Sequence, residues 1–202
     1  MDYYLLGDGD VLDGILVEEF AFAPDHTTVG LGMTAWTTAH RRWWSWAPFS
    51  RAVRADPDVR ARVRAVDRAE ADTAFRTLAG APLPDPAALR NAFRDYLPLP
   101  AAQPLRLGTG RVHRILLAGD VPDIAGLAAA LDLTGRPDDH RVVGSGRDGS
   151  TRWELRRVGP GLAWCVDLAS PPEVEKVGVR LRWLSATVRR HGLIPVTIEL
   201  LG

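Results

Sequence analysis

The sequence lacks the residues that build metal clusters and the net charge that attracts polyanions. Its 202 residues include one cysteine, Cys165, and one lysine, Lys176, and 25 basic residues balance 25 acidic ones. A single cysteine excludes an intramolecular disulfide and a cysteine-clustered zinc or iron–sulfur site. Zero net charge removes the general attraction to nucleic acid that a basic protein has. We therefore expect no metal and no cofactor, and nucleic-acid binding only through a local patch.

Long apolar runs and an export signal are lacking as well. The longest uncharged stretch of the first half, 27–39, is shorter than the ~18 residues that a membrane-spanning helix needs. Asp2 and Asp8 stand where an export signal is basic. We expect a cytoplasmic protein with no membrane partner. The use of arginine in place of lysine, with much alanine, glycine and proline, indicates a GC-rich bacterial genome.

The N-terminal module, residues 1–100, begins with a strand pattern. Apolar residues alternate with others in 15–22 and in 29–35, which predicts two or three antiparallel strands. From Thr38 the spacing of apolar residues becomes helical until Pro48 interrupts it. The pattern therefore predicts strands followed by a short helix.

Two Asp-Pro pairs mark the helices that follow. Asp56-Pro57 is typical of a helix start, and Gly80 marks the end of that helix. Asp85-Pro86 begins a second helix, which Pro98 ends. Residues 101–110 are rich in proline and glycine and predict an extended connector.

The C-terminal module, residues 111–202, predicts an α+β arrangement. Its expected elements are strand 111–118, helix 122–133, strand 140–144, strand 151–158, strand 161–169, helix 172–191 and strand 195–201. Segment 140–144 is either a strand of its own or a lead-in to a hairpin, so the order is interpreted as βαββαβ. This order resembles the ferredoxin-like fold, a similarity of fold and not of family. It implies a four-stranded sheet with both helices on one face.

The opposite face of this sheet is the first candidate site. Alternation along strand 161–169 directs its tryptophan, valine and leucine toward the helices and leaves Cys165 and Asp167 on the other face. Glu199 falls on that face too, and His113 reaches it in one of two registers. Desolvation would raise the pKa of the carboxyl groups for acid–base catalysis, and a histidine would activate the thiol. These four residues are the candidate catalytic residues, and an inert packed face is the alternative.

A tryptophan cluster is the second candidate site. Four of the seven tryptophans lie between residues 36 and 46. Indoles stack on bases, sugars and aromatic ligands, and neighbouring arginines add cation–π contacts. The same indoles can instead fill the joint between strands and helices. The candidate ligand- or partner-binding residues are Trp43, Trp44, Trp46, His40 and Arg41.

Acidic and basic residues are segregated along the chain. Residues 1–25 carry seven acids and no basic residue, whereas 41–68 carry eight arginines against three aspartates. The two segments either pair within the fold or face separate partners. Arg60, Arg64 and Arg68 form one column of the predicted helix, where like charges repel unless acids or a partner approach. These three arginines are candidate partner-binding residues, with nucleic acid as an alternative ligand.

No catalytic motif stands out. Gly144–Gly149 matches G-x-G-x-x-G, but a strand pattern follows it where a dinucleotide site needs a helix, so it predicts a hairpin turn. We favour a non-enzymatic accessory, regulatory or immunity-type bacterial protein that binds a protein or peptide partner. One alternative is a small natural-product-type tailoring enzyme with a cleft between the C-terminal sheet face and the tryptophan-rich segment. The other is arginine-mediated nucleic-acid binding.

Overall fold

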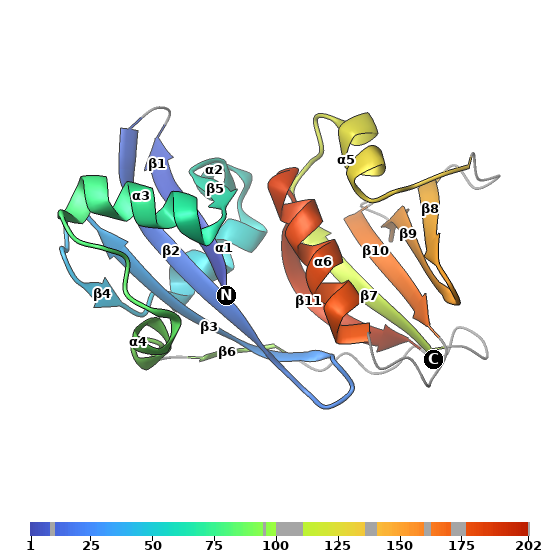
Figure 1. Ribbon diagram of the computed structural model, residues 1–202, viewed down its shortest axis with the longest axis horizontal. Helices are drawn as coiled ribbons and strands as arrows, with labels where there is room; N and C mark the ends of the chain where they lie inside the picture. Colours follow the sequence, from blue (N-terminus) through green and yellow to red (C-terminus); the bar gives the residue numbers. More distant parts are fainter. Residues whose placement is uncertain are drawn as a thin grey trace. The chain divides into compact units, whose positions relative to one another are not determined.

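The protein is a mixed α+β chain with two antiparallel sheets and six helices among its described residues (Figure 1). The computed structural model describes residues 1–8, 11–94, 96–99, 111–135, 141–159, 163–170 and 177–201. They fall into two compact units: Met1–Ala21 with Val29–Leu99, and Phe22–Thr28 with Pro100–Gly202. The predicted connector, 101–110, lies outside the described residues.

The first unit contains a six-stranded sheet. Its strands are β1 (Asp2–Asp8), β2 (Val11–Phe22), β3 (Thr28–Thr37), β4 (Trp43–Trp44), β5 (Val63–Val66) and β6 (Tyr96–Pro98). The order is β4-β3-β2-β1-β5, and β6 also pairs with β3. The alternating segments 15–22 and 29–35 are confirmed as parts of β2 and β3.

Three of the four helices of the first unit begin at aspartates. The four are α1 (Ala47–Ala55), which begins after Trp46, α2 (Pro57–Ala61), α3 (Arg68–Ala79) and α4 (Pro86–Asn91). The carboxylates of Asp56, Asp67 and Asp85 accept first-turn backbone N–H groups at 2.8 to 2.9 Å, which satisfies donors that a helix start leaves free. Gly80 ends α3 with φ 72°, as predicted.

Three helix predictions for the first unit are wrong. The helix that begins at Asp85-Pro86 ends at Asn91 and not at Pro98, because residues 96–98 form the strand β6 and pair with β3. The helix expected between Pro57 and Gly80 is divided by β5, whose backbone pairs with β1. Strand pairing with a distant segment overrides the local helical pattern there. Residues 38–41 form a turn before β4, and Pro48 lies in the first turn of α1, where its missing N–H costs nothing.

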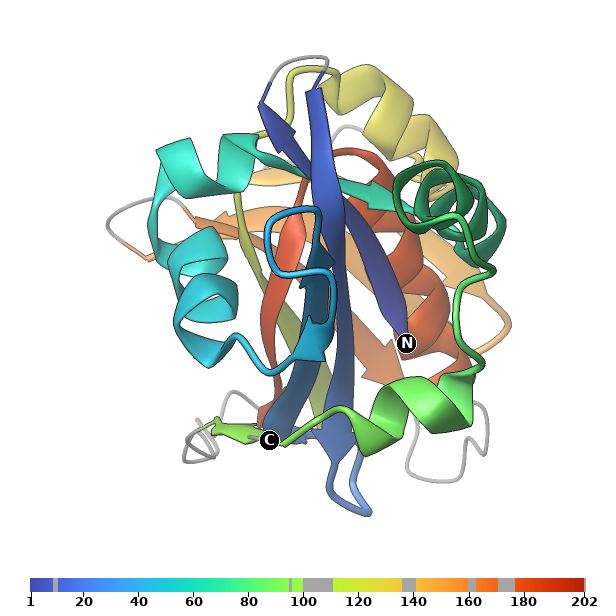
Figure 2. The same ribbon diagram turned by 90° about the vertical axis from the view of Figure 1, so that its left-hand side faces the viewer.

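Helices cover both faces of the first sheet. Ala71, Ala74 and Phe75 of α3 share a buried cluster with Ile15 and Val17 of β2. On the other face, the α1 residue Arg54 contacts Glu18 and Phe20 of the same strand. Figure 2 shows α1 and α2 on one side of the strands and α3 on the other. Alternate side chains of β2 therefore pack against helices on opposite faces of the sheet.

The second unit contains a five-stranded sheet and two helices. The elements are β7 (Arg111–Ala118), α5 (Ile124–Ala130), β8 (Val142–Asp148), β9 (Thr151–Val158), β10 (Ala163–Ser170), α6 (Val177–Arg190) and β11 (Ile194–Leu201). Neighbours are antiparallel in the order β11-β7-β10-β9-β8. Because β8 is a full strand, the sheet has five strands where four were expected. The predicted ferredoxin-like βαββαβ arrangement is not confirmed.

Both helices of the second unit lie on the same face of its sheet, as expected. Leu127 of α5 and Leu184 of α6 share one buried cluster with Trp164, Val166 and Leu168 of β10. The alternation along β10 therefore directs these three side chains to the helices. The same alternation leaves a second, polar face.

The glycine motif of the second unit is a hairpin, as predicted. Asp148 pairs with Thr151, and Gly149 between them has φ 58°, a conformation that favours glycine. Gly146 faces the indole of Trp153, where a Cβ atom would lie 2.3 Å from the ring. One glycine thus makes the turn and another makes room for a buried indole.

Candidate functional site

The polar sheet face of the second unit collects three of the four candidate catalytic residues. Asp167 pairs with Arg114 in the β10–β7 register, and Arg114 pairs with Glu199 in the β7–β11 register. The thiol of Cys165 lies 3.8 Å from an oxygen of Asp167. His113 does not join them, because its register with Leu168 places it on the helix-covered face. The expected pairing of thiol and imidazole is therefore not formed.

Arg114 determines the chemistry of this face. Its Nε and Nη2 atoms each donate to an oxygen of Asp167 at 2.7 Å, in a two-pronged ion pair that leaves little of the carboxylate free. Burial, and then the charge of Asp167, raise the pKa of the Cys165 thiol to about 12. A thiol with this pKa holds almost no thiolate near neutral pH. The arrangement favours a structural ion pair over nucleophilic catalysis.

The three arginines expected in one column lie on different elements. Arg60 is in α2 and donates to the carbonyl oxygens of Val53 and Arg54, and Arg64 is in β5 and pairs with Glu70 at 2.7 Å. Arg68 begins α3 and donates to the hydroxyl of Tyr3. The predicted basic helix is therefore wrong, because β5 separates its parts.

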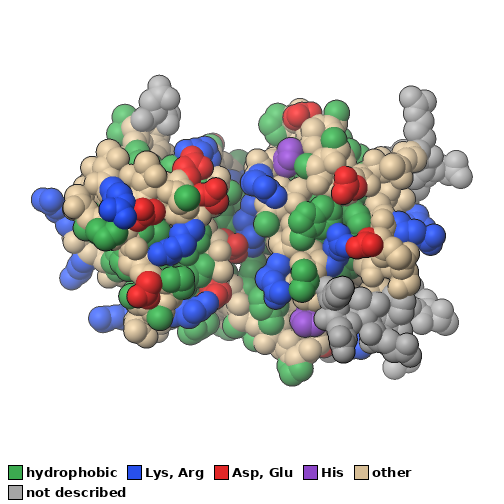
Figure 3. All heavy atoms as spheres, viewed as in Figure 1, with side chains coloured by type: hydrophobic (Ala, Val, Ile, Leu, Met, Phe, Trp, Pro, Cys, Tyr) green, Lys and Arg blue, Asp and Glu red, His purple; other side chains and the backbone are tan. Residues whose placement is uncertain are grey.

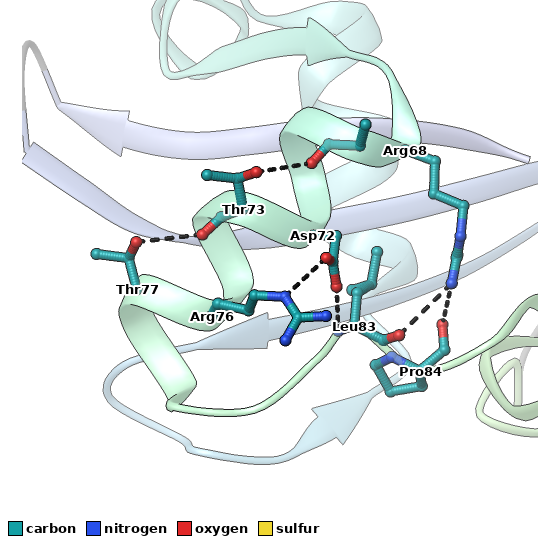
Figure 4. Close-up of polar contacts among 8 residues, drawn as sticks. Arg68, Asp72, Thr73, Arg76, Thr77, Leu83 and Pro84 are labelled. Atoms are coloured by element: carbon teal, nitrogen blue, oxygen red, sulfur yellow. Dashed lines mark hydrogen bonds and ion pairs between the residues drawn. The ribbon is translucent and has the colours of Figure 1, made fainter.

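Arg68 instead helps to fasten the segment that follows α3. Its Nη2 atom donates to the carbonyl oxygen of Pro84 at 2.9 Å, while Asp72 accepts the N–H of Leu83 at 2.8 Å (Figure 4). The Arg76 side chain and that N–H lower the pKa of Asp72. Arg68 and Asp72 therefore hold residues 83–84 against α3.

The acidic N-terminal segment pairs with arginines of the same unit, one of the two expected outcomes. Glu18 pairs with Arg54, Glu19 with Arg90, and Asp13 with Arg62. Basic and acidic side chains are interspersed on the face of this unit that Figure 3 shows. Three of the seven acids of residues 1–25 thus pair with arginines of the same unit.

The tryptophan segment forms two aromatic groups in the first unit. Trp36 and Trp43 pack on Phe75 of α3 with ring centroids 5.2 and 5.4 Å away. His40, Trp44, Trp46 and Phe49 form a row, with successive ring centroids 4.3, 5.4 and 4.2 Å apart. Because the segment is a turn and a short strand, Trp43, Trp44 and Trp46 are all half-buried. The spacing of the three indoles predicts that at least one of them is partly exposed, and all three are.

Part of this row lines a hollow of about 260 Å³, which we call the aromatic hollow. Its walls are Leu6 of β1, Asp13 of β2, the turn at 37–40, Trp46 and Phe49 at the start of α1, and Arg62 after α2. Backbone bonds hold these walls in place. The carbonyl of Asp13 accepts the N–H of Thr38 at 2.9 Å, and that of Trp46 accepts the N–H of Phe49 at 3.1 Å.

A second hollow of about 420 Å³ adjoins the first, and we call it the aliphatic hollow. It is lined by residues 5–7 of β1, Val11 and Leu12 of β2, and residues 61–64. Leu6 and Arg62 belong to the walls of both hollows, so Arg62 stands between them. Val11 is 65% exposed at this hollow, which makes it the most exposed large apolar side chain among the described residues.

Polar groups of both signs lie at the aromatic hollow. Arg62 Nη2 is 3.8 Å from Asp13 Oδ2, and both side chains are about half-exposed, so the pair is loose. The Nδ1 atom of His40 lies 3.1 Å from the hydroxyl of Thr37. Arg41 and Arg42 follow on the exposed turn and form no ion pair with a described residue. The hollow therefore combines an aromatic wall, one carboxylate and one guanidinium, and two more arginines follow its His40 wall.

The sequence pointed to part of this site. It identified His40 and Trp46 in the walls and Arg41 beside them, because aromatic and arginine residues crowd one segment. It missed Leu6, Asp13 and Arg62, which come from distant segments and carry no motif. Only the pairing of β1 with β2 and β5 brings them together.

Comparisons with protein-family models, curated proteins and solved structures find no match to this chain. None of the described helices combines the length and the apolar character that crossing a bilayer takes. Within the described ranges, no three histidine, cysteine or acidic side chains gather in a way that would hold a metal ion. The geometry of the site is therefore the basis for the functional argument.

Proposed function

We propose that the protein is a non-enzymatic binding protein that holds a peptide segment of another protein across the aromatic and aliphatic hollows. The observation that carries this proposal is that the hollows adjoin and share Leu6 and Arg62. An extended peptide fills neighbouring pockets with separate side chains, and pockets of this kind give such interfaces their specificity. Half-buried aromatic residues and arginine are also the residues enriched at the centre of protein interfaces.

The charges around the hollows favour an acidic segment as the partner. At the aromatic hollow, Arg62 and the exposed Arg41 and Arg42 that follow its His40 wall outnumber one acid, Asp13. The aliphatic hollow has another acid beside it, because Asp8 pairs with Val11 in the register of β1 and β2. Charge complementarity speeds association and rejects partners of the wrong sign. An accessory, regulatory or immunity-type role in the bacterial cytoplasm is the context that we propose for such a protein.

The two alternatives have less support. The enzyme proposal needs a free carboxylate or a thiolate at the polar sheet face, where Arg114 holds Asp167 and the Cys165 thiol has a raised pKa. Glu199 is the remaining candidate there, and its carboxylate accepts from the hydroxyl of Thr197 at 3.1 Å. The nucleic-acid proposal rested on a column of three arginines, which lie on separate elements. Both therefore rank below peptide binding.

For the second unit we propose a ferredoxin-like core with one added strand. If β7, β9, β10 and β11 are the four strands of a βαββαβ unit, the strand order β11-β7-β10-β9 places the last strand of the unit beside the first. The strand β8 then extends the sheet at its edge. This proposal concerns the fold of the unit and carries no function.

The binding proposal is tested by selecting peptides from a displayed library of short random sequences on the full chain. We expect acidic peptides with apolar side chains, whose affinity falls at least about tenfold on the Arg62→Glu variant. Arg62 is about half-exposed, so the variant should fold, and circular dichroism checks that it does. The measurement is the dissociation constant of each selected peptide by calorimetry.

Arg182→Glu is the matched control, because it makes the same charge change at an exposed position of α6. Peptides that lose affinity equally on both variants respond only to net charge. That result, or a selection that yields no peptide dependent on Arg62, would reject the proposal.

A further inference from the structure

We propose that the aromatic hollow receives the side chain of a tyrosine from the partner, an inference that rests on the binding function proposed above. The hollow of about 260 Å³ has room for one aromatic ring and is too small for several residues of a peptide. It has an aromatic wall and a polar end. The aromatic wall matches the ring of a tyrosine side chain, and the polar end matches its hydroxyl group.

The aromatic wall favours a planar apolar group. The rings of Trp46 and Phe49 are stacked, with centroids 4.2 Å apart and planes 16° from parallel, so they form a firm surface. Trp44 continues the row beside Trp46. An added ring that packs against such a wall gains offset-stacked or edge-to-face contacts as well as buried area.

The polar end distinguishes tyrosine from the other aromatic side chains. Asp13 offers a carboxylate acceptor and Arg62 a guanidinium donor, and the two groups are 3.8 Å apart. A phenol hydroxyl donates one hydrogen bond and accepts another, so a single oxygen can serve both groups. Phenylalanine serves neither of them, and an indole N–H can only donate. An arginine side chain would pair with Asp13 but would be repelled by Arg62.

The neighbouring cations specify the residues that flank this tyrosine. Arg41 and Arg42 are exposed on the turn that continues from the His40 wall, and Arg62 separates the aromatic from the aliphatic hollow. An acidic residue next to the tyrosine would meet these arginines, while a more distant apolar residue would enter the aliphatic hollow. The inferred ligand is therefore a tyrosine with acidic neighbours in an extended segment.

The inference is tested with one peptide from the selection described above and its Tyr-to-Phe analogue. On the wild-type chain we expect the loss of the hydroxyl to weaken binding about tenfold. On Asp13→Ala, which removes the acceptor at a half-exposed position, we expect the preference for tyrosine to fall well below tenfold, because only the hydrogen bond from Arg62 remains. Asp148→Ala, at an exposed aspartate of β8 in the second unit, is the control that should preserve the preference.

The outcomes separate this inference from the proposed function. Peptides that depend on Arg62 but contain no tyrosine, or that tolerate its replacement by phenylalanine, overturn the inference and leave the binding function in place. A tenfold preference for tyrosine that persists on Asp13→Ala overturns the assigned hydrogen bond and, with it, the assigned pocket. A selection with no peptide dependent on Arg62 overturns both proposals.

Discussion

Cys165 illustrates how the surroundings of a single residue decide its chemistry. It is fully buried, and its Sγ atom lies 3.8 Å from a carboxylate oxygen of Asp167. Burial and this negative charge both oppose the thiolate, which is why the pKa of the thiol rises to about 12. The side chain that the sequence presented as a nucleophile is therefore in an environment that suppresses nucleophilicity.

We predict that Cys165 is unreactive in the folded protein. The aromatic disulfide reagent DTNB should label it at least about a hundredfold more slowly in buffer than in denaturant, because the thiol is both inaccessible and protonated. The readout is the release of the coloured thiolate near neutral pH, with Cys165→Ser as the blank. Native labelling as fast as in denaturant would restore the residue as a candidate nucleophile.

His113 makes the stability of the fold depend on pH. Its Nε2 atom lies 2.8 Å from the backbone oxygen of Asp25, and only 4% of the residue is exposed. Burial lowers the pKa of His113, and the nearby His26 and Arg111 lower it further, while the groups of Asp25 oppose this change. Since the unfolded chain then binds a proton more readily than the folded one, folding stability is full above about pH 6.5 and falls as the pH drops through the folded pKa.

We therefore predict that His113→Gln flattens the acid side of the stability profile, because the glutamine amide can donate to the same oxygen and does not titrate. The measurement is the free energy of unfolding in guanidinium chloride at about pH 7.5 and about pH 5.5. His40→Gln, at an exposed histidine, is the control. Equal losses of stability in wild type and His113→Gln would show that other groups cause the acid sensitivity.

At the scale of elements, a buried ion pair joins α1 to β2. Arg54 donates to both oxygens of Glu18 at 3.0 and 2.8 Å, and the side chains are 7% and 2% exposed. Burial disfavours the charged arginine, but the charge of Glu18 and its hydrogen bonds outweigh that effect and raise the pKa of Arg54. Each charge is therefore tolerated in the interior only while the other is present.

We predict that Glu18→Leu or Arg54→Met each destabilises the protein by about 3 to 5 kcal/mol, because each leaves a buried partner uncompensated. The double variant Glu18→Leu with Arg54→Met should lose less than the sum of the single losses. Denaturant unfolding gives the three free energies. Arg90→Met, which breaks the exposed pair with Glu19, is the control and should have a much smaller effect. Additive losses in the double variant would mean that the two side chains do not stabilise each other.

The sequence predicts those elements that local residues determine and misses those that depend on a distant partner. Asp-Pro pairs and the terminal Gly80 predicted helix boundaries correctly, because capping involves only neighbouring residues. The strand β5 was missed because its four residues become a strand through pairing with β1. The strand β4 was missed for the same reason, since it pairs with β3 across a turn.

In the candidate site, too, the sequence indicated the residues of one local segment and missed those that come from distant segments. Trp46 and His40 were identifiable because aromatic residues are concentrated in one segment. Arg62 gave no separate signal, since it was one of eight arginines in its region and its position depends on the path of the chain after α2. Asp13 was one of seven acids in residues 1–25, and two of the others, Glu18 and Glu19, pair elsewhere. A site assembled from four segments is set by strand register, which periodicity alone does not fix.

At the scale of the whole molecule, each unit has its own sheet and its own buried cluster. The first carries the two hollows and the second carries the polar sheet face. The proposed binding function uses only the first unit. Changes in the second unit that leave the fold intact should therefore leave peptide affinity unchanged.

The location of a bound peptide tests the account most directly. A selected peptide is titrated into the isotope-labelled full chain, and NMR follows the chemical shifts of the backbone amides and indole N–H groups of the chain. We predict that the largest shifts occur at the indole of Trp46 and at residues 37–40 and 61–64, which line the two hollows. Shifts confined to residues 111–201, with the Trp46 indole unmoved, would contradict the account.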